Sequence, residues 1–254
     1  MESVIVERDA GVVTLTLNRP ERRNALDIPT WRAAIALFEE IARSEEDRVL
    51  LITGAGSSFC AGGDLSGAQE SGSGGDSALD VVRTTVNAFV LGLFELPVPT
   101  IAAVEGSAAG AGANLAFACD LVITGTSARF SEIFIRRALP VDSGGSWLLP
   151  RLVGMQRAKE LAFFGDWIAA PDAAEIGLVN RVVPDGQALT TAREWAARLS
   201  GFSRTTLRNT KANLNRAFET TLAESLDDEA LSMRECTGTP EFAEAVAALF
   251  AKGR

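Results

Sequence analysis

The sequence contains no histidine and no tyrosine, and these absences exclude several kinds of chemistry. Without histidine the chain cannot form a Ser/His/Asp or Cys/His nucleophilic system, nor a metal site with a histidine ligand. Without tyrosine it lacks the phenol base that many small nicotinamide-dependent reductases use. Acid–base chemistry in this chain must therefore rely on carboxylates, backbone donors or lysine.

Cysteine and positive charge are also scarce. The three cysteines, Cys60, Cys119 and Cys236, are odd in number and widely spaced, which is typical of a reducing compartment rather than of a disulfide framework. Lys and Arg number 24 against 33 Asp and Glu, which gives a net charge of −9 and a pI near 4.7. Nucleic acid and anionic membranes require a basic surface, so we expect neither as a partner.

Long apolar runs are missing as well. No run of eighteen apolar residues occurs, and the N-terminus alternates polar and apolar residues without the basic and apolar segments of a secretory signal. We therefore expect a cytoplasmic protein. A chain of 254 residues, of which 47% are hydrophobic, is long enough to bury one large core.

The hydrophobic pattern alternates between strand and helix periods. It predicts strands over residues 3–8, 12–17, 49–52, 100–104 and 121–124, and helices over 30–43, 79–95 and 111–119. This order indicates an α/β fold with glycine-rich turns at the ends of strands. Residues 71–77 are rich in Gly and Ser and predict a loop. After Trp195 the pattern is helical and highly charged, so we expect a core of residues 1–195 and a helical region of residues 196–254.

Two glycine-rich turns each follow a predicted strand, at residues 59–65 (FCAGGDL) and 105–115 (EGSAAGAGANL). Small residues let backbone N–H groups approach a ligand, and Gly110 with Ala111 would open a helix whose first N–H groups lack internal partners. Such donors stabilise developing negative charge. The alternative is that both are tight turns that allow close packing. A dinucleotide site is disfavoured, because Phe59 and Leu115 stand where a third glycine is required.

Together the two turns resemble those of the crotonase superfamily, also called the enoyl-CoA hydratase/isomerase family. The resemblance covers nearly the whole chain. It extends to LNRPERRNAL at residues 17–26, AAVEGSAAGAGANLAFACD at 102–120, PVDSGGSWLLPRLVG at 140–154 and AAEIGLVNRVV within 169–183. It implies a crotonase-like spiral of repeated ββα units, with a C-terminal helical region that joins subunits into a homotrimer or homohexamer. It also implies an acyl-CoA thioester substrate, with no metal and no redox cofactor.

The resemblance further assigns roles to individual residues. The oxyanion donors fall on the N–H groups of Gly63 and Ala111. Arg22 and Arg23 are assigned to the phosphates of CoA, although they could instead belong to an ordinary solvated turn. Lys252 would contact the CoA bound to the adjacent subunit. The residues expected to contact CoA are Arg22, Arg23, Ala25, Ala61, Asp64, Leu65, Gly110 and Lys252.

The sequence departs from the family pattern at the two glutamates of the hydratases, which are replaced here by Asn114 and Phe134. Hydration needs one group to activate water and another to protonate carbon, so this loss favours another reaction. Glu132 would share a face with Phe134 in an extended segment and is a candidate replacement.

Asp142 is the better candidate acid–base group. The PVDSGG block resembles that of phenylacetyl-CoA-pathway isomerases and some enoyl-CoA isomerases, in which an aspartate here carries the proton. Its alternative role is to cap the following turn. We therefore favour an isomerase that shifts a proton and a double bond on an enoyl-CoA. A hydratase of altered specificity that uses Glu132 with Asp142, and an inactive acyl-CoA binder, are the alternatives.

Overall fold

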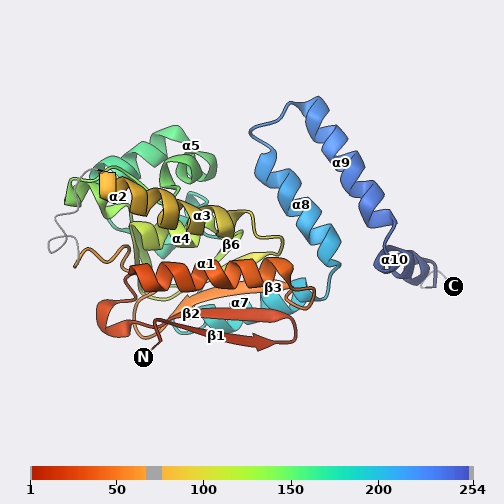
Figure 1. The fold of residues 1–254 in the computed structure, drawn as a ribbon, viewed down its shortest axis with the longest axis horizontal. Coiled ribbons are helices and arrows are strands. Elements are labelled where there is room, and N and C mark those ends of the chain that lie inside the picture. The colour runs from red at the N-terminus through yellow and green to blue at the C-terminus, as the bar shows by residue number, and fades with distance from the viewer. Residues whose placement is uncertain (1, 67–75, 252–254) are drawn as a thin grey trace.

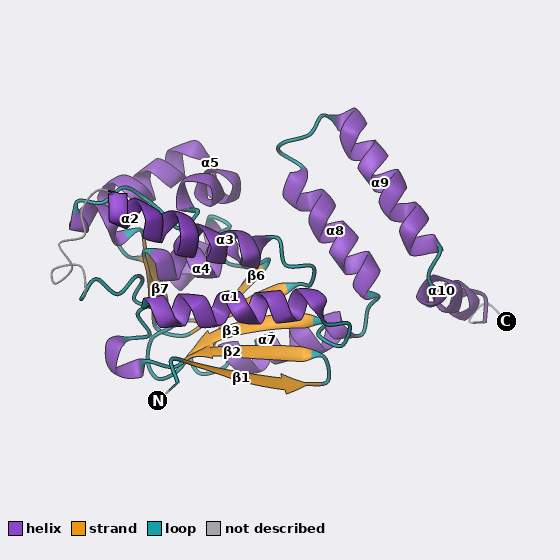
Figure 2. Ribbon diagram, in the orientation of Figure 1, coloured by secondary structure: helices purple, strands orange, loops and turns teal. Residues whose placement is uncertain are grey.

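The computed structural model describes residues 2–66 and 76–251, and its centre is a six-stranded sheet covered by helices (Figures 1 and 2). The strand order is β1-β2-β3-β4-β6-β9. Strands β1 and β2 form the expected antiparallel hairpin, and every other neighbouring pair is parallel. The bounds are Val4–Asp9 (β1), Val12–Leu17 (β2), Val49–Gly54 (β3), Thr100–Val104 (β4), Leu121–Gly125 (β6) and Arg181–Val183 (β9).

A second, three-stranded sheet has the order β5-β7-β8, with bounds Ser107–Ala109, Arg129–Ser131 and Ile168–Ala169. Strands β4 and β5 are consecutive in the chain but belong to different sheets, and the same holds for β6 and β7. A helix follows β5. Two strands divided between two sheets and then a helix make one turn of the ββα spiral, so the predicted fold class is confirmed.

The helices follow the sequence pattern closely. In the part of the chain that the structure describes, no helix is long and apolar enough to span a membrane. Their bounds are α1 (Ile28–Arg43), α2 (Asp76–Val81), α3 (Asn87–Phe94), α4 (Ala111–Ala118), α5 (Gly145–Phe164), α6 (Ala170–Glu175), α7 (Ala188–Ser200), α8 (Arg204–Arg216), α9 (Leu222–Thr237) and α10 (Pro240–Ala251), with the short turns η1 (Pro20–Arg22) and η3 (Ile133–Arg137) and the π-helical segment η2 (Val82–Val86).

The core lies on both faces of the large sheet. Leu50 and Ile52 of β3 pack in one cluster with α1, α3 and α4, whereas Val49 and Leu51 point to the other face. There they meet a stripe of alanines on α7, at positions 188, 192 and 196, which lets this helix lie close to the strands. Burial of each large aliphatic side chain stabilises the fold by about 1.5–3 kcal/mol. The buried sheet is therefore a stable support for the turns at its ends.

Helices α8, α9 and α10 leave this core and extend to one side of it (Figure 1). Helix α8 is attached to the core by polar contacts: Lys211 Nζ lies 2.9 Å from Asp120 Oδ2, and Asn215 donates to the carbonyl of Phe94 at 3.1 Å. The boundary expected at residue 195 falls inside α7. Because α7 buries its alanine face on the sheet, the chain leaves the core only after Ser200.

Two expectations concern the segment before α3. The loop predicted over residues 71–77 falls mostly outside the described residues, although Asp76 already belongs to α2. The helix predicted over 79–95 is present, but Val82–Val86 is π-helical. Single turns of π-helix often occur beside functional sites, and Val82 and Val86 both line the cavity described below.

Candidate active site

The two glycine turns lie side by side because residues of one turn pair with residues of the other in a parallel bridge. Cys60 forms a parallel bridge with Ala108, and the N–H of Ala109 donates to the Cys60 carbonyl at 3.0 Å. The contact is so close that a Cβ on Gly62 would stand 2.7 Å from the carbonyl oxygen of Ala109 and 3.5 Å from the nitrogen of Ala111. Gly62 has φ +97°, a backbone conformation that favours glycine.

The peptide of Gly63 is held so that its N–H faces the cavity. The carbonyl of Gly62 accepts from the N–H of Leu26 at 2.8 Å, and the N–H of Asp64 donates back to the Leu26 carbonyl at 3.0 Å. In a trans peptide the C=O and the N–H point in opposite directions, so the N–H of Gly63 points away from Leu26. Within the described residues this N–H has no acceptor.

The N–H of Ala111 is presented in a comparable way. The carbonyl of Gly110 accepts from the N–H of Asn114 at 3.0 Å, which is the first hydrogen bond of α4. The N–H of Ala111 therefore points out of the N-terminus of the helix, and no residue that the structure describes accepts from it. The strained backbone that permits this belongs to Gly110, with φ 51° and ψ −123°. The helix dipole adds partial positive charge at this end.

Gly63 and Ala111 line one cavity of about 920 Å³. Its wall also carries the apolar side chains of Val82, Val86, Phe134 and Leu139. Three carboxylates face it, at Asp27, Asp64 and Asp142, together with the guanidinium groups of Arg19, Arg22 and Arg137. This is the composition of a ligand site: mostly apolar, with a few polar groups at defined places.

Asp142 lies in the loop between η3 and α5. Burial raises the pKa of its carboxyl, and a hydrogen bond from the Ser143 hydroxyl to Oδ1, at 2.6 Å, opposes that rise. In the described residues no Lys or Arg forms an ion pair with it. A half-buried, unpaired carboxylate in a cavity is suited to accept and return a proton.

Arg19 forms ion pairs with the other two carboxylates. Its Nη2 lies 2.9 Å from Asp64 Oδ2 and 3.4 Å from Asp27 Oδ2, while Nη1 donates to the carbonyl of Ala25 at 2.6 Å. Hydrogen bonds from Ser66, and then the contact with Arg19, lower the pKa of Asp64 to about 2. Arg19 thus ties the turn that carries Gly63 to the N-terminus of α1, where Asp27 caps the helix by accepting from Thr30.

Glu132 lies behind the cavity rather than in its wall. Its side chain is buried with 2% exposure, and Oε2 accepts from the amide of Asn114 at 3.3 Å. Burial raises its pKa to about 8; the hydrogen bond from Asn114 lowers it, and the charge of Asp142 raises it further. Burial therefore favours the protonated form of Glu132 at pH 7. The same amide of Asn114 donates to the backbone carbonyl of Asp142 at 2.9 Å, so the three residues form one polar cluster.

The other residues expected to contact the ligand fall into three groups. Arg22, Ala25, Ala61, Leu65 and Gly110 line the cavity together with Asp64. Arg23 does not: it occupies a left-handed turn with φ 50°, and its carbonyl accepts from the N–H of Ala61 at 2.9 Å while its side chain is exposed. Lys252 lies outside the described residues.

Sequence reasoning missed Arg19, Arg137 and the positioning contacts of Asn114. Arg19 and Asp64 are 45 residues apart, so no local pattern connects them. Asn114 was noticed only as the place of a missing glutamate. The buried contact between its amide and the loop of Asp142 spans 28 residues and depends on how α4 and α5 pack.

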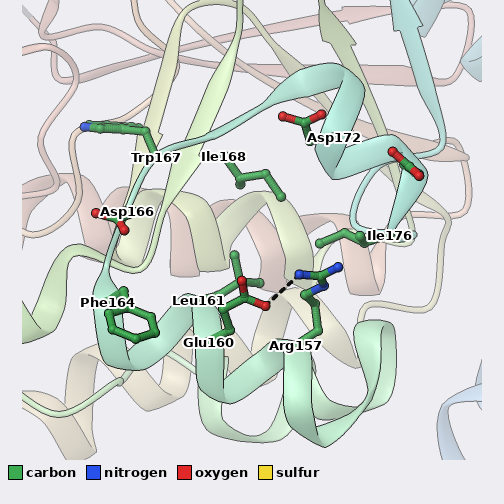
Figure 3. Close-up of a pocket in the computed structure, with 10 residues that line it drawn as sticks. Arg157, Glu160, Leu161, Phe164, Asp166, Trp167, Ile168, Asp172 and Ile176 are labelled. Carbon is green, nitrogen blue, oxygen red and sulfur yellow. Dashed lines mark hydrogen bonds and ion pairs between the residues drawn. The ribbon is translucent and has the colours of Figure 1, made fainter.

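A second cavity, of about 390 Å³, lies between the end of α5 and α6 and shares no lining residue with the first (Figure 3). Figure 3 shows Arg157 bonded to Glu160, a contact of 2.6 Å. It has no pair of convergent backbone donors. No cluster of three or more potential metal ligands occurs among residues 2–66 and 76–251. The cavity of the two turns is lined by Gly63, Ala111 and Asp142, so it is the candidate active site.

Comparison with known proteins leads to one family. A family model for enoyl-CoA hydratase/isomerase matches residues 7–253. The 1,2-epoxyphenylacetyl-CoA isomerase of Escherichia coli is 39% identical over 99% of this chain and 97% of its own. The short-chain-enoyl-CoA hydratase of Clostridium acetobutylicum is 33% identical over 99% of this chain and 96% of its own.

Solved structures agree with these sequence matches. The crystal structure of an enoyl-CoA hydratase from Mycobacterium smegmatis has a TM-score of 0.93 and 31% identity, and the match covers 99% of this chain and 97% of that one. The wound ββα fold, the paired glycine turns and these matches lead to the same conclusion: the chain belongs to the enoyl-CoA hydratase/isomerase family, the crotonase superfamily.

Proposed function

We propose that this enzyme is an enoyl-CoA isomerase in which Asp142 moves a proton while the N–H groups of Gly63 and Ala111 hold the thioester oxygen. One observation carries the proposal. Of the three carboxylates that face the cavity, Asp27 and Asp64 are ion-paired with Arg19, and in the described residues only Asp142 has no cationic partner. Family membership alone leaves the reaction open, because both an isomerase and a hydratase are close relatives.

The proposed reaction is a proton transfer between two carbons of a 3-enoyl thioester. The carboxylate of Asp142 takes a proton from the carbon beside the thioester; the C–H electrons move toward the carbonyl, whose oxygen becomes an enolate oxygen. The N–H groups of Gly63 and Ala111 stabilise that charge, by about 3 kcal/mol for each donor. Asp142 then returns the proton to the γ-carbon, and the double bond shifts into conjugation. CoA is part of the substrate, and no step requires a metal or a redox cofactor.

The cavity supports a substrate with an apolar acyl group. The wall of the cavity includes Val86, Phe134 and Leu139, whose side chains offer no hydrogen bonds to a polar acyl chain. Arg22 lines the same cavity and is exposed, so it is available to the phosphates of CoA. The cation of Arg19, by contrast, is already neutralised by two carboxylates.

Asp142→Asn tests the proposal, since the amide keeps the shape of the side chain and removes the base. We expect isomerase turnover to fall by about two to four orders of magnitude while acyl-CoA affinity stays nearly constant. Asp227→Asn, which removes an exposed carboxylate on α9, is the control and keeps full activity. If Asp142 were only a turn cap, asparagine would replace it well and activity would persist.

Hydration is the second candidate, and one observation favours it: the charge of Asp142 acts on Glu132, and Asn114 donates both to the Glu132 carboxyl group and to the backbone carbonyl of Asp142. This reaction would need Glu132 to reach water in the cavity, whose wall it does not form. Rapid hydration of crotonyl-CoA, without migration of a 3-enoyl double bond, would replace the isomerase proposal. Binding of acyl-CoA without any turnover would support an inactive binder.

We also propose that the subunits assemble as a homotrimer or homohexamer through the C-terminal helices. Large apolar side chains on α9 and α10 and in the segment before α9 are exposed in the single chain, among them Phe218, Leu222, Leu249 and Phe250 at 70% or more. Surfaces of this kind are typical of subunit interfaces. In such an assembly Lys252 would reach the CoA of a neighbouring subunit.

A further inference from the structure

Asn114 is a fully buried polar residue that joins two walls of the active site. It lies on α4 at 0% exposure, one helical turn after Ala111. Its Nδ2 donates to the backbone carbonyl of Asp142 at 2.9 Å and to Glu132 Oε2 at 3.3 Å. Helix α5 begins beside it with Gly145, where a Cβ would stand 2.5 Å from Nδ2. The packing therefore leaves room for this amide and for little else.

The loop that carries Asp142 needs such a contact. Its backbone is left-handed at Ala138 (φ 55°), Ser143 (φ 51°) and Gly144 (φ 82°). For residues other than glycine this conformation costs roughly 1–3 kcal/mol each, and it persists only where the surroundings hold it. The carbonyl of Asp142 accepts from the N–H of Gly145 at 3.0 Å and from the amide of Asn114. The second bond is the one that fixes the loop to α4.

The orientation of the amide is also determined. The carbonyl of Asp142 can only accept, so nitrogen rather than oxygen of the Asn114 amide must face it. Glu132 Oε2 accepts the remaining hydrogen of the same nitrogen. An amide turned over would place Oδ1 against the Asp142 carbonyl oxygen, so two acceptors would meet and the bond to that carbonyl would be lost.

We propose that Asn114 and Glu132 are positioning residues: Asn114 holds the backbone of Asp142 at a fixed place relative to the Ala111 donor, and Glu132 fixes the Asn114 amide. Neither side chain lines the cavity, so neither touches the substrate. The inference rests on the proposed role of Asp142. The proposal gives a role to Asn114, which stands on α4 where the hydratases of the family have a glutamate.

Glu132 adds a pH dependence to this arrangement. Among the described residues, Asp142 is the ionisable group whose charge acts on it, and burial keeps Glu132 neutral below about pH 8. Above that pH a second negative charge appears next to Asp142. This charge opposes both the ionisation of Asp142 and the formation of an enolate, so activity should fall on the alkaline side as Glu132 ionises.

The test measures kcat and acyl-CoA affinity separately in the full-length enzyme. Asn114→Ala is expected to lower kcat about 10- to 100-fold, because the base loses its place, with affinity nearly unchanged. Asn213→Ala, which removes an amide bonded to Ser232 on the C-terminal helices, is the matched control. An Asn114→Ala variant that folds and keeps its kcat, or that loses kcat and affinity equally, overturns the proposal.

Glu132 variants give an independent readout. Glu132→Met removes the acceptor and should lower kcat, whereas Glu132→Gln keeps an acceptor, restores most of kcat at pH 7 and removes the fall in activity near pH 8. A Glu132→Met variant that folds and keeps its kcat would refute the positioning role, even if Asn114→Ala failed to fold. An unchanged alkaline limb in Glu132→Gln would refute the pH dependence assigned to Glu132. Loss of activity in Glu132→Gln at pH 7 would refute the positioning role too, and would assign direct proton transfer to Glu132. Absence of isomerase activity in the unmodified enzyme is a separate result, which contradicts the proposed function instead.

Discussion

Glu132 and Asp142 are two carboxyl groups in one cluster whose surroundings differ. Both have raised pKa values because of burial, but Asp142 faces the cavity and Glu132 faces Asn114. The difference suits one group to exchange protons with a substrate and the other to stay neutral. At this scale the chemistry depends on which atoms each carboxyl group can reach, as well as on its pKa.

The raised pKa of Glu132 predicts a pH dependence of stability. The folded protein holds this proton up to about pH 8, whereas the unfolded chain releases it near its ordinary value of 4.5. The contribution of Glu132 is therefore fully present below pH 4.5, and it is lost as pH rises from there to about 8. In Glu132→Gln we expect the free energy of unfolding to decline less as the pH rises, because the contribution of this ionisation is removed. Urea unfolding of both proteins between pH 4.5 and 9 measures it, and parallel curves would contradict the expectation.

Asp64 predicts the opposite dependence. Its pKa is lowered from 3.8 to about 2, so the stability that it contributes is present above pH 3.8 and is lost as pH falls toward 2. At pH 7, Asp64→Asn should have a lower midpoint of thermal unfolding than the unmodified protein. The difference between the two midpoints should become smaller as the pH falls from 4 to 2. The exposed Asp227 serves as the comparison, with Asp227→Asn close to the unmodified protein throughout. A gap that did not change with pH would exclude the ion pair as its cause.

At the scale of elements, the site depends on how closely α4 packs against the turn of residues 59–65. A Cβ on Gly112 would stand 2.5 Å from the Cys60 carbonyl oxygen and 2.7 Å from its sulfur, whereas one on Gly63 would meet no atom within 4 Å. Gly112→Ala must therefore move the helix that carries Ala111, and overpacking of this kind costs about 1–3 kcal/mol.

Gly63→Ala is the matched substitution, because it adds the same methyl group to the neighbouring turn. We expect it to change the free energy of unfolding by less than about 0.5 kcal/mol, against about 1–3 kcal/mol for Gly112→Ala. Chemical unfolding of the two variants compares them directly. Equal losses would show that the two turns are not packed as described.

The regular elements were predictable because each depends on local pattern. The hairpin of residues 3–17, the strand 100–104 and the helix 111–119 follow from period and from glycine positions. The paired turns were predictable for the same reason, and the resemblance to the family then assigned the donors to Gly63 and Ala111. The Arg19–Asp64 pair and the Asn114–Asp142 bond were not, since each joins segments far apart in the sequence. The sharp bend at Gly154 inside α5, with φ 74° and ψ 163°, gave no periodic signal either.

For the whole molecule, the exposed apolar side chains of the C-terminal helices predict that several copies of the chain associate. Leu222 and Leu226 are 77% and 54% exposed on one side of α9, at a spacing of one helical turn. We expect light scattering to give the mass of three or six subunits. The double substitution Leu222→Asp and Leu226→Asp should reduce that mass, whereas Asp227→Lys on the same helix should not. A monomer in the unmodified protein at micromolar concentration would contradict the expectation.

The proposed oxyanion donors belong to the backbone, so they respond to mutation differently from side chains. Mutation replaces side chains; among the twenty residues only proline removes an N–H. Gly63 and Ala111 can therefore exchange for several residues without loss of the donor, while a single base change at Asp142 or Asn114 alters the proton chemistry. If the proposed roles hold, binding of the thioester oxygen is inherited with the fold, and a few side chains around the site decide which reaction follows.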